Sequence, residues 1–296
     1  MDKLFNSYSL LFLIAFSLYG CNTIDDPKTL TLGIVHFQPA GKSSIQLGEI
    51  ADELKKQFPN TQVNTTGTTN YNKGAEIICN GDVNKSKWDL VFALSPVVSA
   101  KALACGYEPL YQAYGGKPYY SVLFVRKDSD INNLDYINLN KTTLALNQIG
   151  SASGYYLPVY KAWGKTFDKI LFVGDYDRIM DTVNKNINII GVVPSPIFAN
   201  NRLYPQGTFK EIARSPEIPP GLVLINPNLK QDEKAKIKKI LDSIPDENIP
   251  KGDKNQPIYS KKDTSSANYE QLKEIIAKVD TFKCYEKSPV QIKECS

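Results

Sequence analysis

Several signatures of catalysis and of nucleic-acid binding are missing from this chain of 296 residues. It contains a single histidine, His36, and no Walker, GxSxG or HExxH pattern, so ATP hydrolysis and the corresponding hydrolase chemistries are not indicated. No acidic and nucleophilic partners accompany His36, which is better interpreted as a bystander with at most a weak ligand contact. The net charge of +4 arises from 35 basic and 31 acidic residues spread along the chain. Without a basic block or a basic-aromatic stripe, nucleic acid is not an expected partner.

A long hydrophobic run is also missing. The apolar segment Leu10–Phe16 is far shorter than the roughly 20 residues that a membrane-spanning helix needs. It follows Lys3 and precedes the sequence LYGC at Leu18–Cys21. This order resembles a bacterial lipoprotein signal peptide over residues 1–20, and we therefore expect an exported protein.

The end of this signal predicts a lipid anchor. Leu18 and Gly20 fit the lipobox that precedes a lipidated cysteine, whereas Tyr19 is bulkier than the residue usual there. Processing would make Cys21 the lipidated first residue and residues 21–28 a short tether to a bacterial membrane. An uncleaved anchor, or a plain secretory signal with a chance cysteine, is the alternative.

Export favours disulfides among the other four cysteines, Cys79, Cys105, Cys284 and Cys295. Four cysteines allow three pairings. We predict Cys79 with Cys105 and Cys284 with Cys295, because each pair closes a local loop and the two pairs are far apart. A metal site is disfavoured, since no CxxC spacing occurs and only one histidine is present. No cofactor is expected.

The body of the chain alternates strand and helix patterns, which predicts an α/β fold with a mostly parallel sheet. The expected strands include residues 29–35, 61–67, 88–94 and 119–129, and the expected helices include residues 45–58, 71–79, a segment starting near 95, and 266–279. Hydrophobic residues make up 42% of the chain, enough for one two-lobed unit or two small domains. No repeat of fixed period appears, which argues against a solenoid.

The order of four segments resembles the substrate-binding proteins of ABC importers for phosphate, phosphite and phosphonates. These segments are TLTLGIV, the stretch from TTNYNKG to FALSP, the stretch from YYSVLFV to GSASGYYLP, and IARSPEIPPGLV. The resemblance covers nearly all of the mature chain, and GSASGYYLP is its most specific part. It implies a periplasmic-binding-protein (Venus flytrap) fold with two α/β lobes, two crossover strands and a ligand in the cleft. Residues 29–118 and 215–296 would form lobe 1, and residues 119–214 would form lobe 2.

The serine-rich segment of this motif is predicted to bind an oxyanion. Pro158 lacks an N–H and is tolerated in the first turn of a helix, so the helix should start near Ser153 and Gly154. Free amides and the helix dipole favour an anion at such a start, even without charged side chains. The expected donors are the hydroxyls of Ser151 and Ser153 and the amides of Ser153, Gly154, Tyr155 and Tyr156. An ordinary N-cap, in which Ser153 satisfies its own helix, is the alternative.

Further contacts follow from the family resemblance. Tyr71 and Ser95 match positions that line the cleft from lobe 1, although a lone tyrosine such as Tyr71 also serves in core packing. Tyr119 and Tyr120 lie at the crossover, and of the two we assign Tyr120 to the ligand.

The segment Val173–Arg178 departs from the family pattern. Phosphonate binders commonly have a histidine beside an aspartate there, whereas this chain has Tyr176 between Asp175 and Asp177. We assign Tyr176 and Asp175 to the ligand site. The carboxylate would bind a protonated oxyanion, pair with a ligand amine, or remain solvated.

Two functions of different classes follow. The first is a solute-binding lipoprotein that captures a small oxyanion, such as phosphate, phosphite or a phosphonate, and delivers it to an ABC permease with a separate ATPase subunit. The second is a lipoprotein of the same fold that acts as a ligand sensor or surface interaction protein. An aromatic cage for an organic cation also remains open, because the chain has 17 tyrosines. Neither function is enzymatic.

Overall fold

The computed structural model describes residues 28–36, 47–80, 88–113, 118–135, 141–252, 256–261, 264 and 269–295. The predicted signal peptide, Cys21 and residues 22–27 of the predicted tether lie outside the described residues. Lys28, which we expected to end the tether, already belongs to the first strand.

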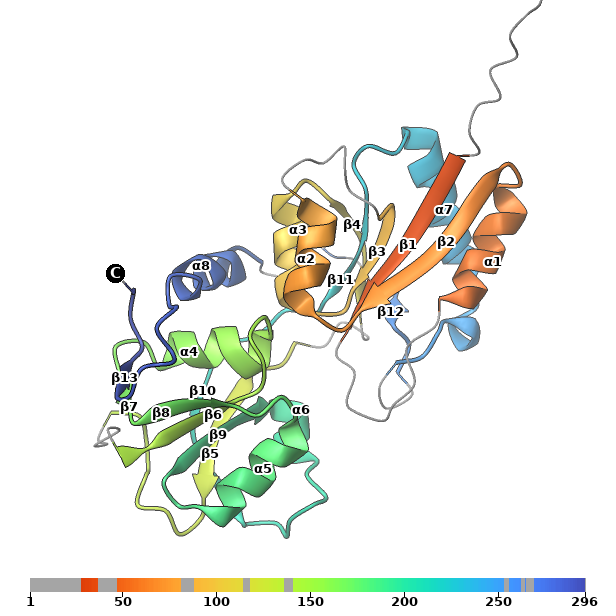
Figure 1. Ribbon diagram of the computed structural model, residues 1–296. Helices are drawn as coiled ribbons and strands as arrows, with labels where there is room; N and C mark the ends of the chain where they lie inside the picture. The colour runs from red at the N-terminus through yellow and green to blue at the C-terminus, as the bar shows by residue number, and fades with distance from the viewer. Residues whose placement is uncertain are drawn as a thin grey trace, which may run out of the picture.

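The described chain forms two lobes, each built on its own sheet (Figure 1). Within the described residues, the sheet of the first lobe has six strands in the order β12-β4-β11-β3-β1-β2. The strands are β1 (Lys28–Val35), β2 (Thr61–Thr68), β3 (Leu90–Ala93), β4 (Glu108–Ala113), β11 (Leu222–Ile225) and β12 (Tyr259–Ser260). β2, β1 and β3 are parallel, whereas β11 runs antiparallel to β3 and β4.

Helices cover both faces of this sheet. Successive residues of β3 alternate between two cores, with Leu90 and Phe92 on one face and Val91 and Ala93 on the other, as the two-residue period of a strand requires. The first face packs against α1 (Gly48–Gln57) and α7 (Gln231–Ser243), which is followed by a short 3-10 turn at Asp246–Asn248. The second face packs against α2 (Tyr71–Cys79) and α3 (Pro96–Ala104).

The second lobe repeats this layering on a sheet with the order β10-β5-β9-β6-β8. Its strands are β5 (Ser121–Arg126), β6 (Thr143–Leu146), β8 (Lys169–Phe172), β9 (Ile189–Pro194) and β10 (Phe209–Arg214). Its helices are a π-helical turn (Ala152–Tyr156), α4 (Leu157–Lys161), α5 (Tyr176–Lys185) and α6 (Ser195–Ala199). β6 is parallel to both of its neighbours, β8 and β9.

Two crossing segments connect the lobes. Tyr119 and Ile218 form an isolated antiparallel bridge, with the Tyr119 N–H donating to Ile218 at 3.2 Å and the Ile218 N–H donating back at 2.6 Å. Next to it, the backbone N–H of Ser121 donates to Ser215 Oγ at 2.9 Å. The chain therefore changes lobes where the sequence predicted two crossover strands.

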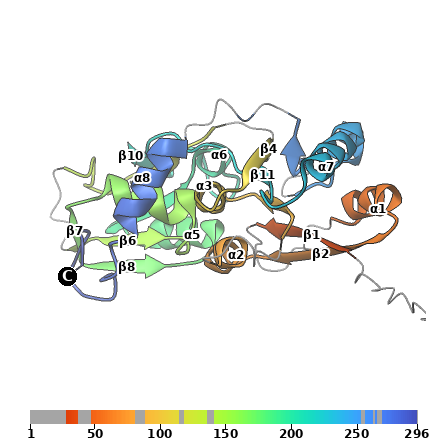
Figure 2. The same ribbon diagram turned by 90° about the horizontal axis from the view of Figure 1, so that it is seen from above.

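The C-terminal part of the chain contacts both lobes, which corrects one expectation. Residues 215–296 were predicted to return to lobe 1, but α8 (Tyr269–Val279) contacts both α3, beside it in Figure 2, and α4, beside it in Figure 1. Beyond it, β13 (Val290–Gln291) pairs with β7 (Thr166–Phe167) in the second-lobe segment. The physical reason is burial, since the apolar face of α8 and the side chains of Val290 and Ile292 are withdrawn from solvent in this arrangement.

Both disulfides expected from the sequence are present, Cys79–Cys105 and Cys284–Cys295. The first joins the carboxyl ends of α2 and α3, and the second closes the segment that follows α8. Each therefore fastens a local loop rather than the two lobes to each other.

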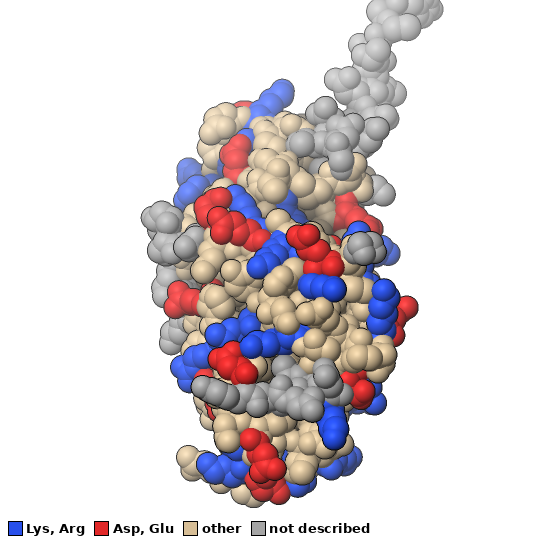
Figure 3. Space-filling view, turned by 90° about the vertical axis from the view of Figure 1, so that its left-hand side faces the viewer, with Lys and Arg blue, Asp and Glu red and all other residues tan. Residues whose placement is uncertain are grey.

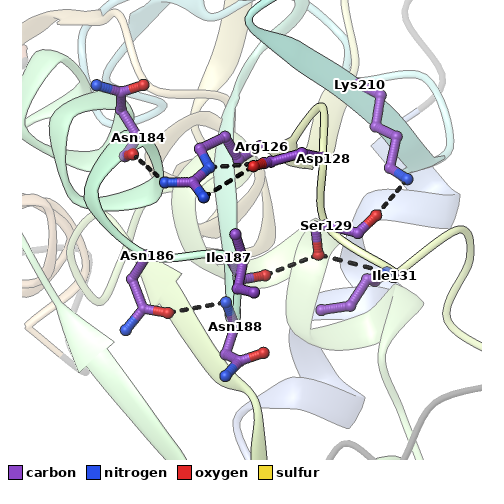
Figure 4. A network of polar contacts seen from close by, with 9 residues as sticks. All are labelled: Arg126, Asp128, Ser129, Ile131, Asn184, Asn186, Ile187, Asn188 and Lys210. Atoms are coloured by element: carbon purple, nitrogen blue, oxygen red, sulfur yellow. Dashed lines mark hydrogen bonds and ion pairs between the residues drawn. The ribbon is translucent and has the colours of Figure 1, made fainter.

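A polar network holds the second lobe together at the end of β5 that lies away from the crossover (Figure 4). The Arg126 guanidinium donates to both carboxylate oxygens of Asp128 and to the Asn184 carbonyl. The hydrogen bond between Arg126 and Asp128 is the main cause that lowers the pKa of the Asp128 carboxyl. Ser129 Oγ donates to the Ile187 carbonyl at 2.7 Å, while Lys210 Nζ donates to the Ser129 carbonyl. The network ties the chain after β5 to the α5–β9 loop and to β10.

Candidate functional site

The candidate site begins where parallel strands of each sheet end. Ser95 follows β3 in the first lobe, and Asn147 follows β6 in the second. Binding sites of open α/β sheets commonly lie at these carboxyl ends. Ser95 is only 5% exposed and Asn147 only 1% exposed, so both polar residues are withdrawn from solvent.

The serine-rich segment turns into its helix through a π-helical turn. Pro158 has no N–H to offer the Gly154 carbonyl four residues earlier, and that carbonyl instead accepts from the Asn147 N–H at 3.0 Å. The amides of Tyr155 and Tyr156 both donate to the Ser151 carbonyl, at 3.1 and 3.0 Å. The proline thus frees a carbonyl that ties the segment to the end of β6.

The start of this helix differs from the prediction in two respects. The N-cap is Ser151, whose Oγ accepts from the Gly154 N–H at 3.0 Å, and the first helical residue is Ala152. The expectation that the amides of Gly154, Tyr155 and Tyr156 would be free was wrong, because Ser151 accepts from all three. Two serines stand two residues apart here, so the sequence did not distinguish which of them caps the helix.

Four hydroxyl groups gather at this point. The Tyr176 hydroxyl lies 3.4 Å from Ser151 Oγ and 3.3 Å from Ser153 Oγ. Tyr119 joins them through a hydrogen bond with Ser153. Burial raises the pKa of the Tyr119 phenol, and the nearby Tyr176 raises it further. We call Ser151, Ser153, Tyr176 and Tyr119 the hydroxyl cluster.

Three other predicted contacts have structural roles. The Asp175 carboxylate caps α5 by accepting from the Arg178 N–H at 2.9 Å. Tyr120 packs under the Arg214 guanidinium, 4.3 Å from the ring centre. The Tyr155 ring is buried and packs against Tyr156 and Phe172. The expectation that Tyr155 offers a free amide to the ligand is therefore not met, and at the crossover Tyr119 rather than Tyr120 joins the hydroxyl cluster.

The first lobe approaches the serine-rich segment through Tyr71. A Cβ atom placed on Gly150, which has a φ of +97°, would lie 3.0 Å from the Tyr71 Cβ and 3.4 Å from Asn72 Oδ1. The N-terminus of α2 therefore packs directly against the loop that precedes Ser151. Ser95 occupies the N-cap position of α3, and its Oγ is buried without a hydrogen-bond partner in the described part of the chain. Its contact with a ligand remains a prediction.

No group of three or more metal-binding side chains occurs within the described ranges. Among the same residues, no helix is both long and apolar enough to cross a membrane. On the face shown in Figure 3, lysine and arginine residues are interspersed with aspartate and glutamate residues. His36 is 5% exposed and follows β1, and its backbone N–H donates to the Thr68 carbonyl at 3.3 Å.

A comparison with known protein families identifies the family of this chain. Residues 32–276 match the family described as "ABC transporter, phosphonate, periplasmic substrate-binding protein". This chain belongs to that family. The family resemblance drawn from the sequence is thereby confirmed, and the family is one of transport substrate-binding proteins.

Solved structures show the same two-lobed fold. XAC2383 from Xanthomonas citri, bound to ATP, shares 17% sequence identity at a TM-score of 0.63, with 84% of this chain and 96% of that chain covered. PhnD1 from Prochlorococcus marinus, in complex with methylphosphonate, shares 19% identity at a TM-score of 0.55, with 85% and 98% covered. No curated protein sequence matches the chain. The α/β fold class predicted from the sequence is confirmed.

In this binding protein, the structure adds Asn147 to the residues beside the serine-rich segment and places Tyr119 next to Ser153, whereas the sequence analysis selected Tyr120. Asn147 was not selected, although a polar residue directly after the apolar strand Thr143–Leu146 is a usable signal. Tyr119 and Tyr120 are adjacent, and strand alternation places them on opposite faces. The sequence contains no cue to which of the two faces the serines.

Proposed function

We propose that this binding protein captures a small oxyanion at the hydroxyl cluster and delivers it to an ABC permease driven by a separate ATPase subunit. The observation that supports the proposal most directly is the convergence of Ser151, Ser153 and Tyr176 at 3.3–3.4 Å. Hydroxyl groups are good donors to phosphoryl-type oxygens, and donors to a charged group form the stronger hydrogen bonds.

The hydroxyl cluster, rather than free helix amides, supplies the donors in this proposal. Ser151 accepts from the amides of Gly154, Tyr155 and Tyr156, whereas the Ser153 and Tyr176 hydroxyls lie 3.3 Å from each other. A hydroxyl rotates at little cost, so each can turn its proton from a neighbour to a ligand oxygen. Ser95 and Tyr71 would complete the site from the first lobe.

Binding should respond strongly to loss of one donor. We expect Ser153→Ala to weaken oxyanion binding about tenfold to a hundredfold, because a hydrogen bond to a charged group contributes roughly 1.5–3 kcal/mol. Tyr176→Phe should have an effect of similar size. Calorimetry with methylphosphonate, phosphite and inorganic phosphate measures the change, and methylphosphonate is the first probe because PhnD1 was solved with it.

The matched control is Ser243→Ala at the end of α7, where Ser243 Oγ donates only to the Ile240 carbonyl. It should leave binding unchanged. Equal affinities of wild type, Ser153→Ala and Tyr176→Phe for a probe that binds would exclude the hydroxyl cluster as the site.

We also propose that the mature protein is anchored by lipid at Cys21, a residue that lies outside the described part of the chain. The support is the apolar segment followed by LYGC in the sequence. Mass spectrometry should find a mature protein that starts with acylated Cys21, and Cys21→Ser should move the protein from the detergent phase to the aqueous phase. A different first residue, or a Cys21→Ser variant that stays in the detergent phase, would contradict the anchor.

A further inference from the structure

Asn147 occupies a central place between the two helix starts of the candidate site. Its backbone N–H donates to the Gly154 carbonyl at 3.0 Å, and its carbonyl accepts from the Gly174 N–H at 3.0 Å. The first bond joins it to the serine-rich segment, and the second joins it to the loop before α5. The backbone of Asn147 is therefore held from both sides.

The side chain of Asn147 has no such partners. The residue is 1% exposed, and within the described residues neither Oδ1 nor Nδ2 makes a hydrogen bond. Burying a polar group without a partner is costly, and native proteins keep few such groups. Both ends of the amide are unpaired within the described residues, whichever end is assigned as oxygen.

The side chain lies beside the hydroxyl cluster. A Cβ atom placed on Gly154 would be 2.5 Å from the Asn147 Cβ and 3.0 Å from Ser151 Oγ, so Asn147 and Ser151 flank the same glycine. Along β6, Ala145 packs in the core that Tyr176 also contacts, whereas Leu144 and Leu146 pack in the opposite core. Strand alternation gives Asn147 the direction of Ala145, toward the side of Tyr176.

We propose that Asn147 is a specificity-determining ligand contact that selects a protonated, singly charged tetrahedral oxyanion. Nδ2 donates to a deprotonated ligand oxygen, and Oδ1 accepts from an O–H of the ligand. The proposal rests on the proposed function and deepens it. The dihydrogen phosphate monoanion and a hydrogen phosphonate monoanion carry such an O–H, whereas sulfate at neutral pH carries none and would leave Oδ1 unpaired.

The charge of the site favours the same ligand class. Asn147 and the four members of the hydroxyl cluster are neutral groups, so none of them offsets a second negative charge on the ligand. An unpaired buried acceptor also discriminates strongly, because a ligand that cannot donate leaves it desolvated and unsatisfied. Sulfate is therefore rejected by the lack of a proton rather than by size.

The test is calorimetry at pH 7 with methylphosphonate, phosphite, inorganic phosphate and sulfate. Wild type should bind at least one of the first three more than tenfold more tightly than sulfate. Asn147→Leu keeps the branching of the side chain but removes the donor and the acceptor. It should weaken binding of that ligand about tenfold to a hundredfold and bring its affinity close to that of sulfate. Asn147→Asp keeps the acceptors and adds a negative charge, so it should weaken the binding of sulfate more than the binding of the protonated ligand.

A stability measurement separates this role from a structural one. Asn147→Leu should raise the melting temperature of the ligand-free protein by about 2–4 °C, because an unsatisfied buried amide is removed. The matched control is Ser260→Ala in β12, at the far edge of the first sheet, where Ser260 Oγ is also buried without a partner. It should stabilise the protein without altering ligand affinity.

The outcomes distinguish the two proposals. If Ser153→Ala weakens binding but Asn147→Leu does not, or if sulfate binds wild type as tightly as the other probes, the role of Asn147 is wrong and the proposed function stands. If Asn147→Leu lowers the melting temperature and leaves affinity unchanged, the residue is structural. If wild type binds none of the oxyanions, both proposals are wrong.

Discussion

Gly154→Val is expected to lower the melting temperature by about 4–10 °C and to weaken oxyanion binding by about a hundredfold or more. A Cβ atom at this position would lie 2.5 Å from the Asn147 Cβ and 3.0 Å from Ser151 Oγ. Asn147 cannot move away easily, since its backbone is hydrogen-bonded on both sides. The added side chain would displace either the end of β6 or the capping serine, and each supports the hydroxyl cluster.

This result differs from what the sequence suggests for the same substitution. From the motif alone, a valine at 154 would stand in the path of an anion at a solvent-facing helix start and leave the fold intact. The structure shows Ser151, Ser153 and Gly154 buried and the glycine packed against β6. Loss of stability therefore accompanies loss of binding.

Thermal unfolding and calorimetry on the same preparation test this prediction. Gly48→Ala is the matched control, because a Cβ atom at Gly48 in α1 meets nothing within 4 Å, and alanine in a helix is slightly stabilising. A Gly154→Val variant with the melting temperature of wild type would show that the contact with Asn147 is easily relieved.

The secondary structure was largely predictable because its signals are local. The spans expected for the first two strands and for the helix at 71–79 correspond to β1, β2 and α2 within one residue at each end. In the last helix, the apolar residues Leu272, Ile275, Ile276 and Val279 recur at helical spacing and are all buried. Periodicity reports which face of an element is apolar, and burial follows from it.

The parts that were not predictable depend on contacts between distant segments. The apolar face of α8 is visible in the sequence, but its pattern does not say that the partners are both α3 and α4. The pairing of β13 with β7 joins two strands of two residues each, too short for a recognisable pattern. For this reason the sequence analysis assigned residues 215–296 to lobe 1 alone.

The candidate site was predicted as a segment and not as a set of atoms. Ser151 and Ser153, which the motif singled out, lie beside Tyr176, and their contact with an anion stays a prediction. The amides of Tyr155 and Tyr156 were wrongly expected to be free, whereas both donate to the Ser151 carbonyl in a π-helical turn. Pro158 has no N–H for the Gly154 carbonyl, which accepts from Asn147 instead. Asp175 caps α5, a role whose sequence signal is the same as that of an aspartate that binds a ligand, and its contact with a ligand stays a prediction.

Removal of the Cys79–Cys105 disulfide should cause the second large effect. The bond closes a loop with a sequence separation of 26 residues, for which loop-closure entropy in the unfolded chain corresponds to about 3–4 kcal/mol. The double variant Cys79→Ser, Cys105→Ser should therefore melt roughly 6–12 °C lower. Differential scanning calorimetry on oxidised wild type and on the variant measures the difference.

The position of this disulfide predicts that stability and binding will separate. Cys79 ends α2, whereas Tyr71 begins it about 12 Å away along the helix, so the variant should keep ligand affinity within about threefold of wild type, a change of ~0.7 kcal/mol. The comparison variant is Cys284→Ser, Cys295→Ser, whose separation of 11 residues predicts a loss smaller by about 0.5–1 kcal/mol. Equal stability of wild type and the Cys79, Cys105 variant would contradict the entropic argument. A large loss of affinity in that variant would instead show that the carboxyl ends of α2 and α3 position the residues at their N-termini.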